Sequence, residues 1–263
     1  MNKNLNIFNF KPNLRYFIFL IVVLLIEGLI HHFYYLISAS INFLEFQNLS
    51  GHNKLIWDEN GCVEILQAIF LFFSIIFFFK YLKNSSHKNV KLNKYINYSY
   101  LIALLYYFFE EISWGQHIFG WETPDFFMKI NSQNETNIHN TSSLLNELPR
   151  NFLFIWCAFS FIYIKFLKFL NDEFKYFIFP NKNLKFISFM ILFFFLPDFL
   201  VDKFDLAPGH PAYDEFDIIL NNFFDVFTFN FIRLSELQEL LFNYYILAHS
   251  YYLRKTHLNL IKF

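Results

Sequence analysis

Six long apolar runs constrain this chain more than any other feature of its sequence. They lie at residues 16–37, 62–82, 95–114, 152–170, 186–201 and 234–253. A helix needs about 20 apolar residues to cross the hydrocarbon core of a bilayer, and each run reaches or approaches that length. No segment shows the in/out alternation of a membrane β-barrel strand. The runs predict an all-α, polytopic bundle of six transmembrane helices, in one domain that takes up residues 1–263.

The composition favours the same class and excludes others. Charged residues make up 16% of the chain, against about 25% in soluble domains. Six glycines leave little room for a phosphate-binding loop, and we find no nucleic-acid motif. The two cysteines, Cys62 and Cys157, lie in apolar runs without a CxxC pattern. They are predicted to be buried free thiols, not a disulfide or a metal site.

The basic residues predict how the helices are oriented. With the N-terminus in the cytoplasm, 16 of the 21 Lys and Arg residues fall in inner segments and the remaining five in outer ones. Such a bias marks the cytoplasmic side. An even number of spans also places the basic C-terminus inside. We therefore expect a multi-pass protein of the bacterial inner membrane with both ends in the cytoplasm.

Three outer loops follow from this topology, at residues 42–61, 115–150 and 202–232. The third contains an apolar stretch, residues 216–231, interrupted by Asp217 and Asp225 among others. This stretch is predicted either to lie in the membrane interface or to dip into the bilayer as a seventh, partial helix.

Carboxylates near the outer ends of different spans suggest a common site. At 1.5 Å rise per residue, each lies within roughly 6 to 8 Å of the outer boundary. The residues concerned are Glu64, Glu110, Glu111, Asp198, Glu236 and Glu239. Ionisable groups in hydrocarbon usually face the bundle interior, so we expect an outward-facing carboxylate-rich pocket. The alternative is that single members are helix-end acids in contact with interfacial water.

The first span carries Glu27 and, one turn later, His31. Counting from the start of the run places Glu27 near mid-membrane, with His31 as the expected partner on the same face. A structural Glu–His pair and a ligand-binding pair both fit this spacing.

The outer loop after the third span is the most distinctive stretch. It begins with Glu110-Glu111-Ile112-Ser113-Trp114-Gly115-Gln116-His117 and continues through Trp121-Glu122-Thr123-Pro124. If the third helix continues that far, Glu110, Ser113, Trp114 and His117 share one stripe. Polar residues then alternate at Asn131, Gln133, Glu135, Asn137 and His139, which in an extended segment would line one face. Amide and carboxylate groups in such a row suit ligand contacts, whereas Trp114 and Trp121 also suit a membrane interface.

These blocks, E-E-I-S-W-G-Q, F-G-W-E-T-P and N-x-Q-x-E-x-N-x-H-N, resemble those of a bacterial family of multi-pass membrane proteins with no established activity. The resemblance covers about 40 residues closely and implies a shared site without naming a reaction. His117 departs from the pattern, because relatives often carry Arg there, so the resemblance does not support His117 as a metal ligand. A weaker likeness joins Ser113 and His117 to the Ser-x3-His spacing of alkaline ceramidase and adiponectin-receptor-type membrane hydrolases. His249 and His257 do not reproduce the second zinc-binding pair of those enzymes.

The first functional hypothesis is a metal-dependent hydrolase or transferase that acts on a lipid-linked substrate at the outer face. A divalent metal ion would lower the pKa of a bound water, and a carboxylate would act as general base. Carboxylates favour Mg²⁺, Ca²⁺ or Mn²⁺, and a histidine ligand would shift the preference towards zinc or iron. The predicted catalytic residues are Glu110, Glu111 and Ser113, and the predicted metal ligands are Glu64, Glu110, Glu111, Glu239 and His139. The predicted substrate-binding residues are Trp114, Gln116, His117, Gln133, Glu135, Asn137 and Glu236.

Two alternatives stay open. A proton- or cation-coupled transporter fits a carboxylate inside the bilayer such as Glu27. Against it, the inner halves of the spans read as almost purely apolar, and no inverted repeat is visible. A non-enzymatic sensor or assembly partner would use the same pocket for ligand binding. The bilayer is the expected partner in all three cases, and nucleic acid in none.

Overall fold

The structure is a computed structural model and describes residues 12–41, 53–57, 61–85, 91–131, 135–166, 184–204 and 232–261. Within these ranges every regular element is a helix, which confirms the all-α class. Six helices have 20 residues or more: α1 (Leu14–Ile41), α3 (Cys62–Ser85), α4 (Lys91–Glu111), α7 (Ser143–Phe166), α9 (Lys185–Phe204) and α12 (Leu234–Ile261). Each coincides with one of the six apolar runs, because long apolar sequence without breakers favours helix.

Two segments, Leu14–Tyr34 and Lys54–Lys83, are long and apolar enough to cross a membrane. The others have lower mean hydropathy or are shorter. The predicted element at residues 216–231 lies outside the described residues, as do most of the predicted loops 42–61 and 202–232.

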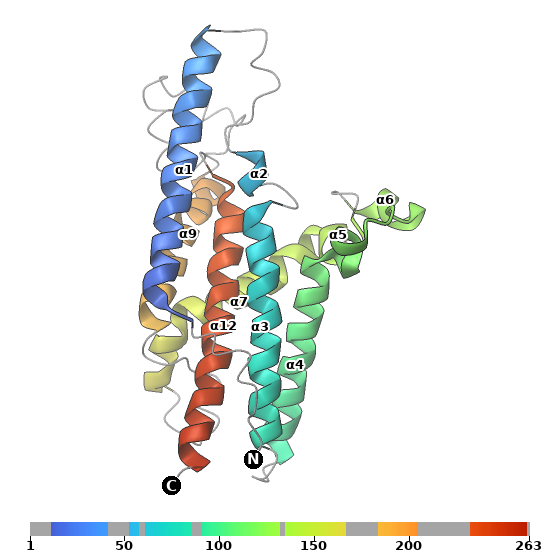
Figure 1. The fold of residues 1–263 in the computed structure, drawn as a ribbon, viewed down its shortest axis with the longest axis vertical. Coiled ribbons are helices and arrows are strands. Elements are labelled where there is room, and N and C mark those ends of the chain that lie inside the picture. Colours follow the sequence, from blue (N-terminus) through green and yellow to red (C-terminus); the bar gives the residue numbers. More distant parts are fainter. Residues whose placement is uncertain are drawn as a thin grey trace, which may run out of the picture.

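Helix α12 is the centre of the bundle. It packs along α3, with α4 on the other side of α3, and it also contacts α9 and α7 (Figure 1). Residues 240–250 of α12 are all buried. A helix that is enclosed on every side must accommodate any polar residue it carries inside the bundle. The polar side chains in this part of α12 therefore lie against neighbouring helices in the interior of the bundle.

Helix α1 lies against α12 through a stacked pair of rings. The rings of Phe17 and Tyr244 are 3.7 Å apart and nearly parallel, and Phe70 of α3 packs on both at a steep angle. Phe17 stands near the start of α1, whereas Phe70 and Tyr244 stand two to three turns into their helices. As a result α1 extends well past the end of the bundle at which α3 and α12 begin (Figure 1). We call the end of the bundle at which α3 and α12 begin and α4 stops the upper end.

Helix α4 stops earlier than the sequence predicts. Its last residue is Glu111, and the short 3-10 helix η2 (Ser113–Gly115) follows with positive φ at all three residues. Left-handed backbone ends an α-helix, so the predicted continuous stripe through Ser113, Trp114 and His117 is wrong. The chain then forms α5 (Gln116–Phe119) and α6 (Asp125–Ile130), which project sideways from the upper end (Figure 1).

Helix α7 begins earlier than expected. Residues 143–150, predicted as outer loop, already belong to it, and Pro149 lies inside it. Pro149 is the seventh residue of α7 and lies past the first turn, so it removes one backbone hydrogen bond from the helix. Of the two cysteines, which are both free, Cys157 of α7 is buried as predicted, whereas Cys62 at the start of α3 is exposed.

Candidate functional site

The upper end of the bundle gathers four carboxylates from three helices. Glu111, the last residue of α4, interacts electrostatically with Glu239 and Glu236 of α12 and with Glu64 of α3. We call these four residues the carboxylate cluster. The three helices meet here because α3 and α12 begin where α4 ends, which places the first turns of two helices beside the last turn of the third.

Fewer basic groups than acids surround the cluster. Arg233, which precedes α12, holds its Nε 3.5 Å from Oε1 of Glu236. Arg150 of α7 and His139 interact favourably with Glu239. Two arginines do not balance four carboxylates, and like charges close together repel strongly where water is scarce. Additional positive charge, in the form of protons or a bound cation, would therefore stabilise the cluster.

Buried amide and carboxylate oxygens also face this region. The side chain of Gln67 is fully buried, and its Nε2 donates to the main-chain oxygen of Glu236 at 2.8 Å and to Oε2 of Glu236 at 3.3 Å. Its Oε1 has no hydrogen-bond partner among the described residues, and neither has the buried Oε1 of Glu111. A buried oxygen without a donor is costly, so these two atoms are available to a ligand with positive charge.

Glu110 faces away from the cluster and holds the outer loop. Its carboxylate accepts hydrogen bonds from Trp114 Nε1 at 2.6 Å and from the main-chain N–H groups of Ile138 and His139 at 2.7 and 2.8 Å. His139 Nδ1 lies 3.2 Å from Oε2 of Glu110, the oxygen that also accepts the two main-chain N–H groups, whereas Trp114 donates to Oε1. Four neighbours on one carboxylate make Glu110 the anchor of the 3-10 turn η3 (His139–Thr141). The geometry thus turns Glu110 towards the outer loop and away from the other predicted metal ligands, whereas His139 interacts with both Glu110 and Glu239.

The polar row of the outer loop turns inward. Ser113 Oγ donates to Oε2 of Glu135 at 2.9 Å, and Asn137 Nδ2 donates to the same oxygen. Asn131 Nδ2 donates to Oδ1 of Asn137 at 2.7 Å. These four residues are buried. Their hydrogen bonds replace the ones that the irregular loop backbone lacks, so the row folds the loop instead of lining an extended face.

A second set of contacts joins the loop to the arm that carries α5 and α6. Gln116 Oε1 accepts from the main-chain N–H of Thr136 at 2.7 Å, and Gln116 Nε2 donates to Thr123 Oγ1 at 2.8 Å. Trp114 is 43% exposed and stacks on Phe109. The side chain of His117 and all of Gln133 lie outside the described part of the chain. The substrate-binding role predicted for these residues therefore stays a prediction.

Comparisons with known proteins add no assignment. No family model, no curated protein and no solved structure matches this chain. The likeness of the E-E-I-S-W-G-Q and neighbouring blocks to a bacterial membrane family therefore remains a resemblance, and the site has to be argued from its geometry.

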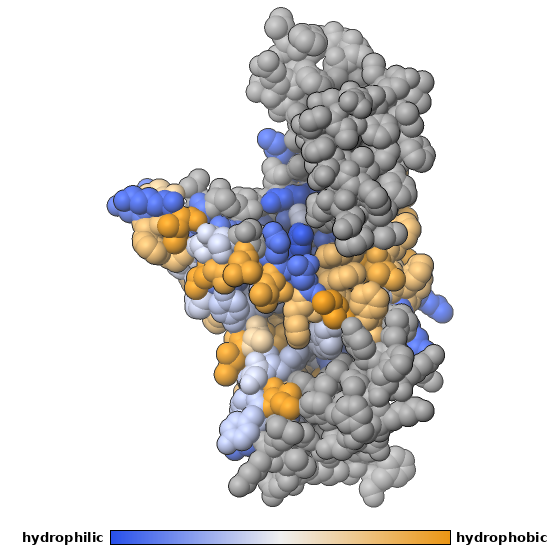
Figure 2. Space-filling model, turned by 180° about the vertical axis from the view of Figure 1, so that it is seen from behind, coloured by the Kyte–Doolittle hydropathy of each residue, from blue (hydrophilic) through white to orange (hydrophobic). Residues whose placement is uncertain are grey.

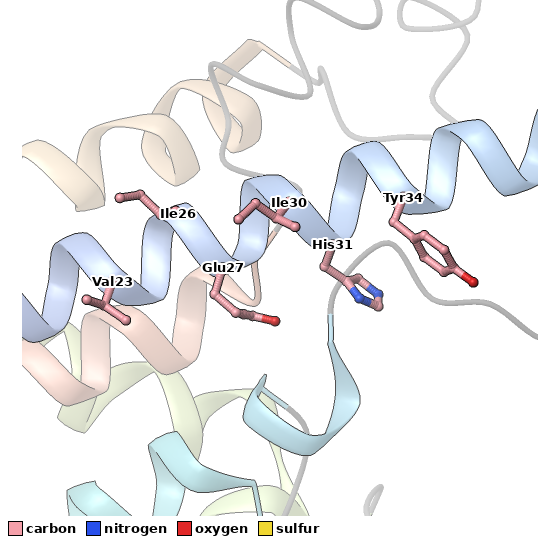
Figure 3. Close-up of a pocket in the computed structure, with 6 residues that line it drawn as sticks. All are labelled: Val23, Ile26, Glu27, Ile30, His31 and Tyr34. Carbon is pink, nitrogen blue, oxygen red and sulfur yellow. The ribbon is translucent and has the colours of Figure 1, made fainter.

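Glu27 has partners that the sequence did not predict. It accepts hydrogen bonds from Asn53 Nδ2 at 2.8 Å and from Trp57 Nε1 at 3.3 Å, at the short helix α2 (Lys54–Trp57) that precedes α3. The expected mid-membrane position of Glu27 and its pairing with His31 stay predictions. Figure 3 shows Glu27 and His31 on one side of α1, in a pocket of about 500 Å³ that they share with apolar side chains.

The cluster does not form a finished metal centre as the side chains stand. Among the described residues, no three His, Cys, Asp or Glu side chains lie close enough together to share a metal ion. The donor set is nevertheless the right kind for a hard divalent cation, namely carboxylate and amide oxygens. Sequence reasoning found Glu64, Glu111, Glu236 and Glu239, but it missed the contribution of Tyr107, which interacts with Glu111 and Glu239 from one turn below on α4.

Proposed function

We propose that this chain is an integral membrane protein with six transmembrane helices and both termini in the cytoplasm. The proposal is supported by the coincidence of six long helices with six apolar runs. It is also supported by large apolar side chains that are exposed on the outward faces of the long helices, among them Phe19, Ile102, Phe152 and Phe189. Soluble proteins rarely expose apolar surface on this scale. Figure 2 shows such residues over much of the described surface.

The proposed topology has a direct test. A fluorescent protein fused after Phe263 should fluoresce in a bacterial host, whereas alkaline phosphatase fused there should be inactive, since that enzyme needs the periplasm. Active phosphatase at the C-terminus would mean an odd number of spans and would place the carboxylate cluster differently.

We infer that the carboxylate cluster binds a hard divalent cation at the outward end of the bundle. The observation that carries this inference is that four acidic side chains, Glu64, Glu111, Glu236 and Glu239, lie near one another, with Arg150, Arg233 and His139 as their basic neighbours. Gln67 and Glu111 add buried oxygens that lack donors among the described residues. Small rotations of these side chains towards a common centre would supply the six to eight oxygens that Ca²⁺ prefers, or fewer together with water for Mg²⁺ or Mn²⁺.

The activity that fits best is a hydrolase or transferase acting on a lipid-linked substrate. The bound cation would act as a Lewis acid on an oxygen of the substrate or on the attacking water. A carboxylate of the cluster that does not bind the cation would take the proton of that water. Trp114 is exposed at the upper end beside the loop and would contact a substrate that enters from the bilayer surface.

The cation site can be tested by titration calorimetry on the purified protein in lipid nanodiscs, with Mg²⁺, Ca²⁺ and Mn²⁺. Glu111→Gln and Glu239→Gln should each weaken binding by at least about tenfold, because each removes a charged ligand. Glu122→Gln is the matched control, since Glu122 is an exposed acid outside the cluster. Equal affinity for all four proteins, or no binding by the unaltered protein, would overturn the proposal.

A further inference from the structure

An arm formed by residues 116–130 leaves the upper end of the bundle sideways. It consists of α5, the connecting residues 120–124 and α6, and it runs across the direction of the long helices (Figure 1). Residues 118–130 are all exposed apart from Thr123 and Phe127, which are half-buried. Most of the surface of the arm is therefore open to a partner outside this chain.

The exposed side chains of the arm are mainly apolar and aromatic. Phe119 is 76% exposed and Phe126 is 67% exposed. The rings of Phe119 and Trp121 stack with their centroids 5.7 Å apart, and those of Phe126 and Phe127 meet edge-on at 5.6 Å. Aromatic side chains of this kind are enriched where the hydrocarbon of a bilayer meets the headgroups. The composition of the arm therefore suits a lipid surface.

Helix α6 separates its apolar from its charged side chains. Phe126 and Ile130 are four residues apart and share one face with Phe127, whereas Asp125 and Lys129, also four apart, share another. A helix with this division lies in the plane of a membrane surface, with the apolar face down and the charged face in water. The opposite charges of Asp125 and Lys129 give the arm no preference for an anionic surface.

The apolar surface of the arm continues the exposed apolar face of α4. Tyr106 and Phe109 of α4 are exposed, and both rings contact that of Trp114, which is itself exposed at the base of the arm. Figure 2 shows hydrophobic side chains along the arm and hydrophilic ones at its tip. In the proposed topology α4 ends at the outer boundary of the bilayer. The lipid that surrounds α4 therefore reaches the arm without any further partner.

Hydrogen bonds at both ends hold the arm in this orientation. At its start, Gln116 donates to Thr123 Oγ1 at 2.8 Å and accepts the main-chain N–H of Thr136 at 2.7 Å. At its end, the buried Asn131 donates its main-chain N–H to the oxygen of Phe127 at 2.8 Å and its side-chain Nδ2 to Asn137. The arm is thus fastened to the outer loop, and its apolar side chains stay on the outside.

We propose that the arm lies in the outer headgroup layer of the membrane, with Phe119, Phe126 and Ile130 against the acyl chains and with Asp125 and Lys129 in water. The inference rests on the proposed membrane location of the long helices. Its partner is the phospholipid itself, and zwitterionic lipid is sufficient because the charged face of α6 is neutral overall. The arm holds the upper end of the bundle at the level of the headgroups, so a lipid-linked substrate reaches that end without leaving the membrane surface.

The test measures how often a nitroxide label collides with oxygen, which concentrates in lipid, and with a nickel chelate, which stays in water. Electron paramagnetic resonance gives both rates for single-cysteine variants in phosphatidylcholine nanodiscs, with the two native cysteines replaced. The ratio of oxygen to nickel collisions at Phe126→Cys and Ile130→Cys should be at least about threefold higher than at Asp125→Cys and Lys129→Cys, because the two faces of α6 meet lipid and water. Each control is the sequence neighbour of the position that it matches.

Two results would overturn the placement of the arm. Equally high nickel rates at all four positions would put the arm in water. Low rates with both reagents at Phe126→Cys and Ile130→Cys would mean that protein, such as a second copy of this chain, covers the apolar face. Phe119→Cys, with Glu122→Cys as its control, repeats the comparison if a label on α6 disturbs that helix. A label at Ile102→Cys, on the exposed face of α4, separates the two proposals: lipid at Ile102 with the arm in water removes the arm alone, whereas water at Ile102 removes the membrane location.

Discussion

Glu110 and Glu111 are consecutive residues, yet their carboxylates belong to different parts of the molecule. Glu110 accepts the main-chain N–H groups of Ile138 and His139 and the indole N–H of Trp114. Glu111 points into the bundle, towards Glu239, Glu236 and Glu64. Consecutive residues on a helix are about 100° apart, so a doublet at a helix end can serve an outer loop and an interior site at once.

Removing the Glu110 carboxylate should release the outer loop. Glu110→Ala leaves two main-chain donors and one indole donor without their acceptor, and each hydrogen bond to a charged group contributes roughly 1.5 to 3 kcal/mol. We expect a lower unfolding temperature and faster proteolytic cleavage between residues 131 and 141. Glu122→Ala, at an exposed position outside these contacts, should change neither. Unchanged cleavage in Glu110→Ala would contradict the anchoring role.

Glu111→Gln should have the opposite effect on stability when no cation is present. The substitution replaces a carboxylate whose charged form is disfavoured, first by burial and then by neighbouring acids, with a neutral amide of the same shape, and the relief is on the order of 1 kcal/mol. The variant should unfold at a higher temperature than the unaltered protein in chelator, and it should gain less on addition of Mn²⁺ or Ca²⁺. Thermal unfolding in nanodiscs with and without cation measures both quantities. A destabilised Glu111→Gln in chelator would show that the carboxylates are not repelling one another.

The turn after α4 depends on Gly115. Its φ is 102°, and a Cβ added there would lie 3.0 Å from the ring of Trp121. Gly115→Ala should therefore cost about 1 to 3 kcal/mol, from backbone strain and from displacement of the indole. Gly120→Ala makes an informative comparison, because Gly120 also has a positive φ of 68° but nothing lies within 4 Å of its added Cβ. Equal losses in the two variants would mean that backbone strain alone sets the cost.

The docking of α1 depends on Phe17. In the proposed membrane location, Phe17→Ala loses packing against Tyr244 and Phe70 but no hydrophobic transfer energy, because lipid is as apolar as the protein interior. A loss of about 1 to 2 kcal/mol is expected from the ring contacts, seen as easier release of α1 in denaturing detergent. Phe19→Ala is the control, since Phe19 is 68% exposed on the opposite face. If Phe19→Ala destabilised α1 as much as Phe17→Ala, the stacked pair would not be what holds this helix.

The lengths of the apolar runs predicted the helices. The position of acidic residues near the outer ends of those runs predicted the carboxylate cluster. Glu64 and Glu239 stand in the first two turns of α3 and α12, and Glu111 ends α4. When the ends of three neighbouring helices lie at one level of a bundle, carboxylates at those ends come close to one another. The apolar runs also predicted the helix positions to within a few residues, except that α7 begins nine residues before its run and α12 ends eight residues after its run.

The rest depends on packing that no local pattern encodes. Glu110 and Glu111 have different contacts because the backbone is left-handed at Ser113 and Trp114, and serine and tryptophan rarely adopt that conformation. The hydrogen bonds that Asn53 and Trp57 donate to Glu27 join residues 26 and 30 positions apart in the sequence. The contribution of Tyr107 follows from the packing of α4 and α12 on the same helix α3, and aromatic residues are too common in this chain for one tyrosine to be singled out.

The central claim is that side chains from three helices share one cation, and a double-mutant cycle on Mn²⁺ affinity tests it most directly. Affinities would be measured by electron paramagnetic resonance for the unaltered protein, Glu64→Gln, Glu239→Gln and the double variant. A shared ion predicts that the double variant loses clearly less than the sum of the two single losses, because the first substitution already disrupts the site. Additive losses, or an affinity that neither substitution changes, would contradict a common site at the upper end of the bundle.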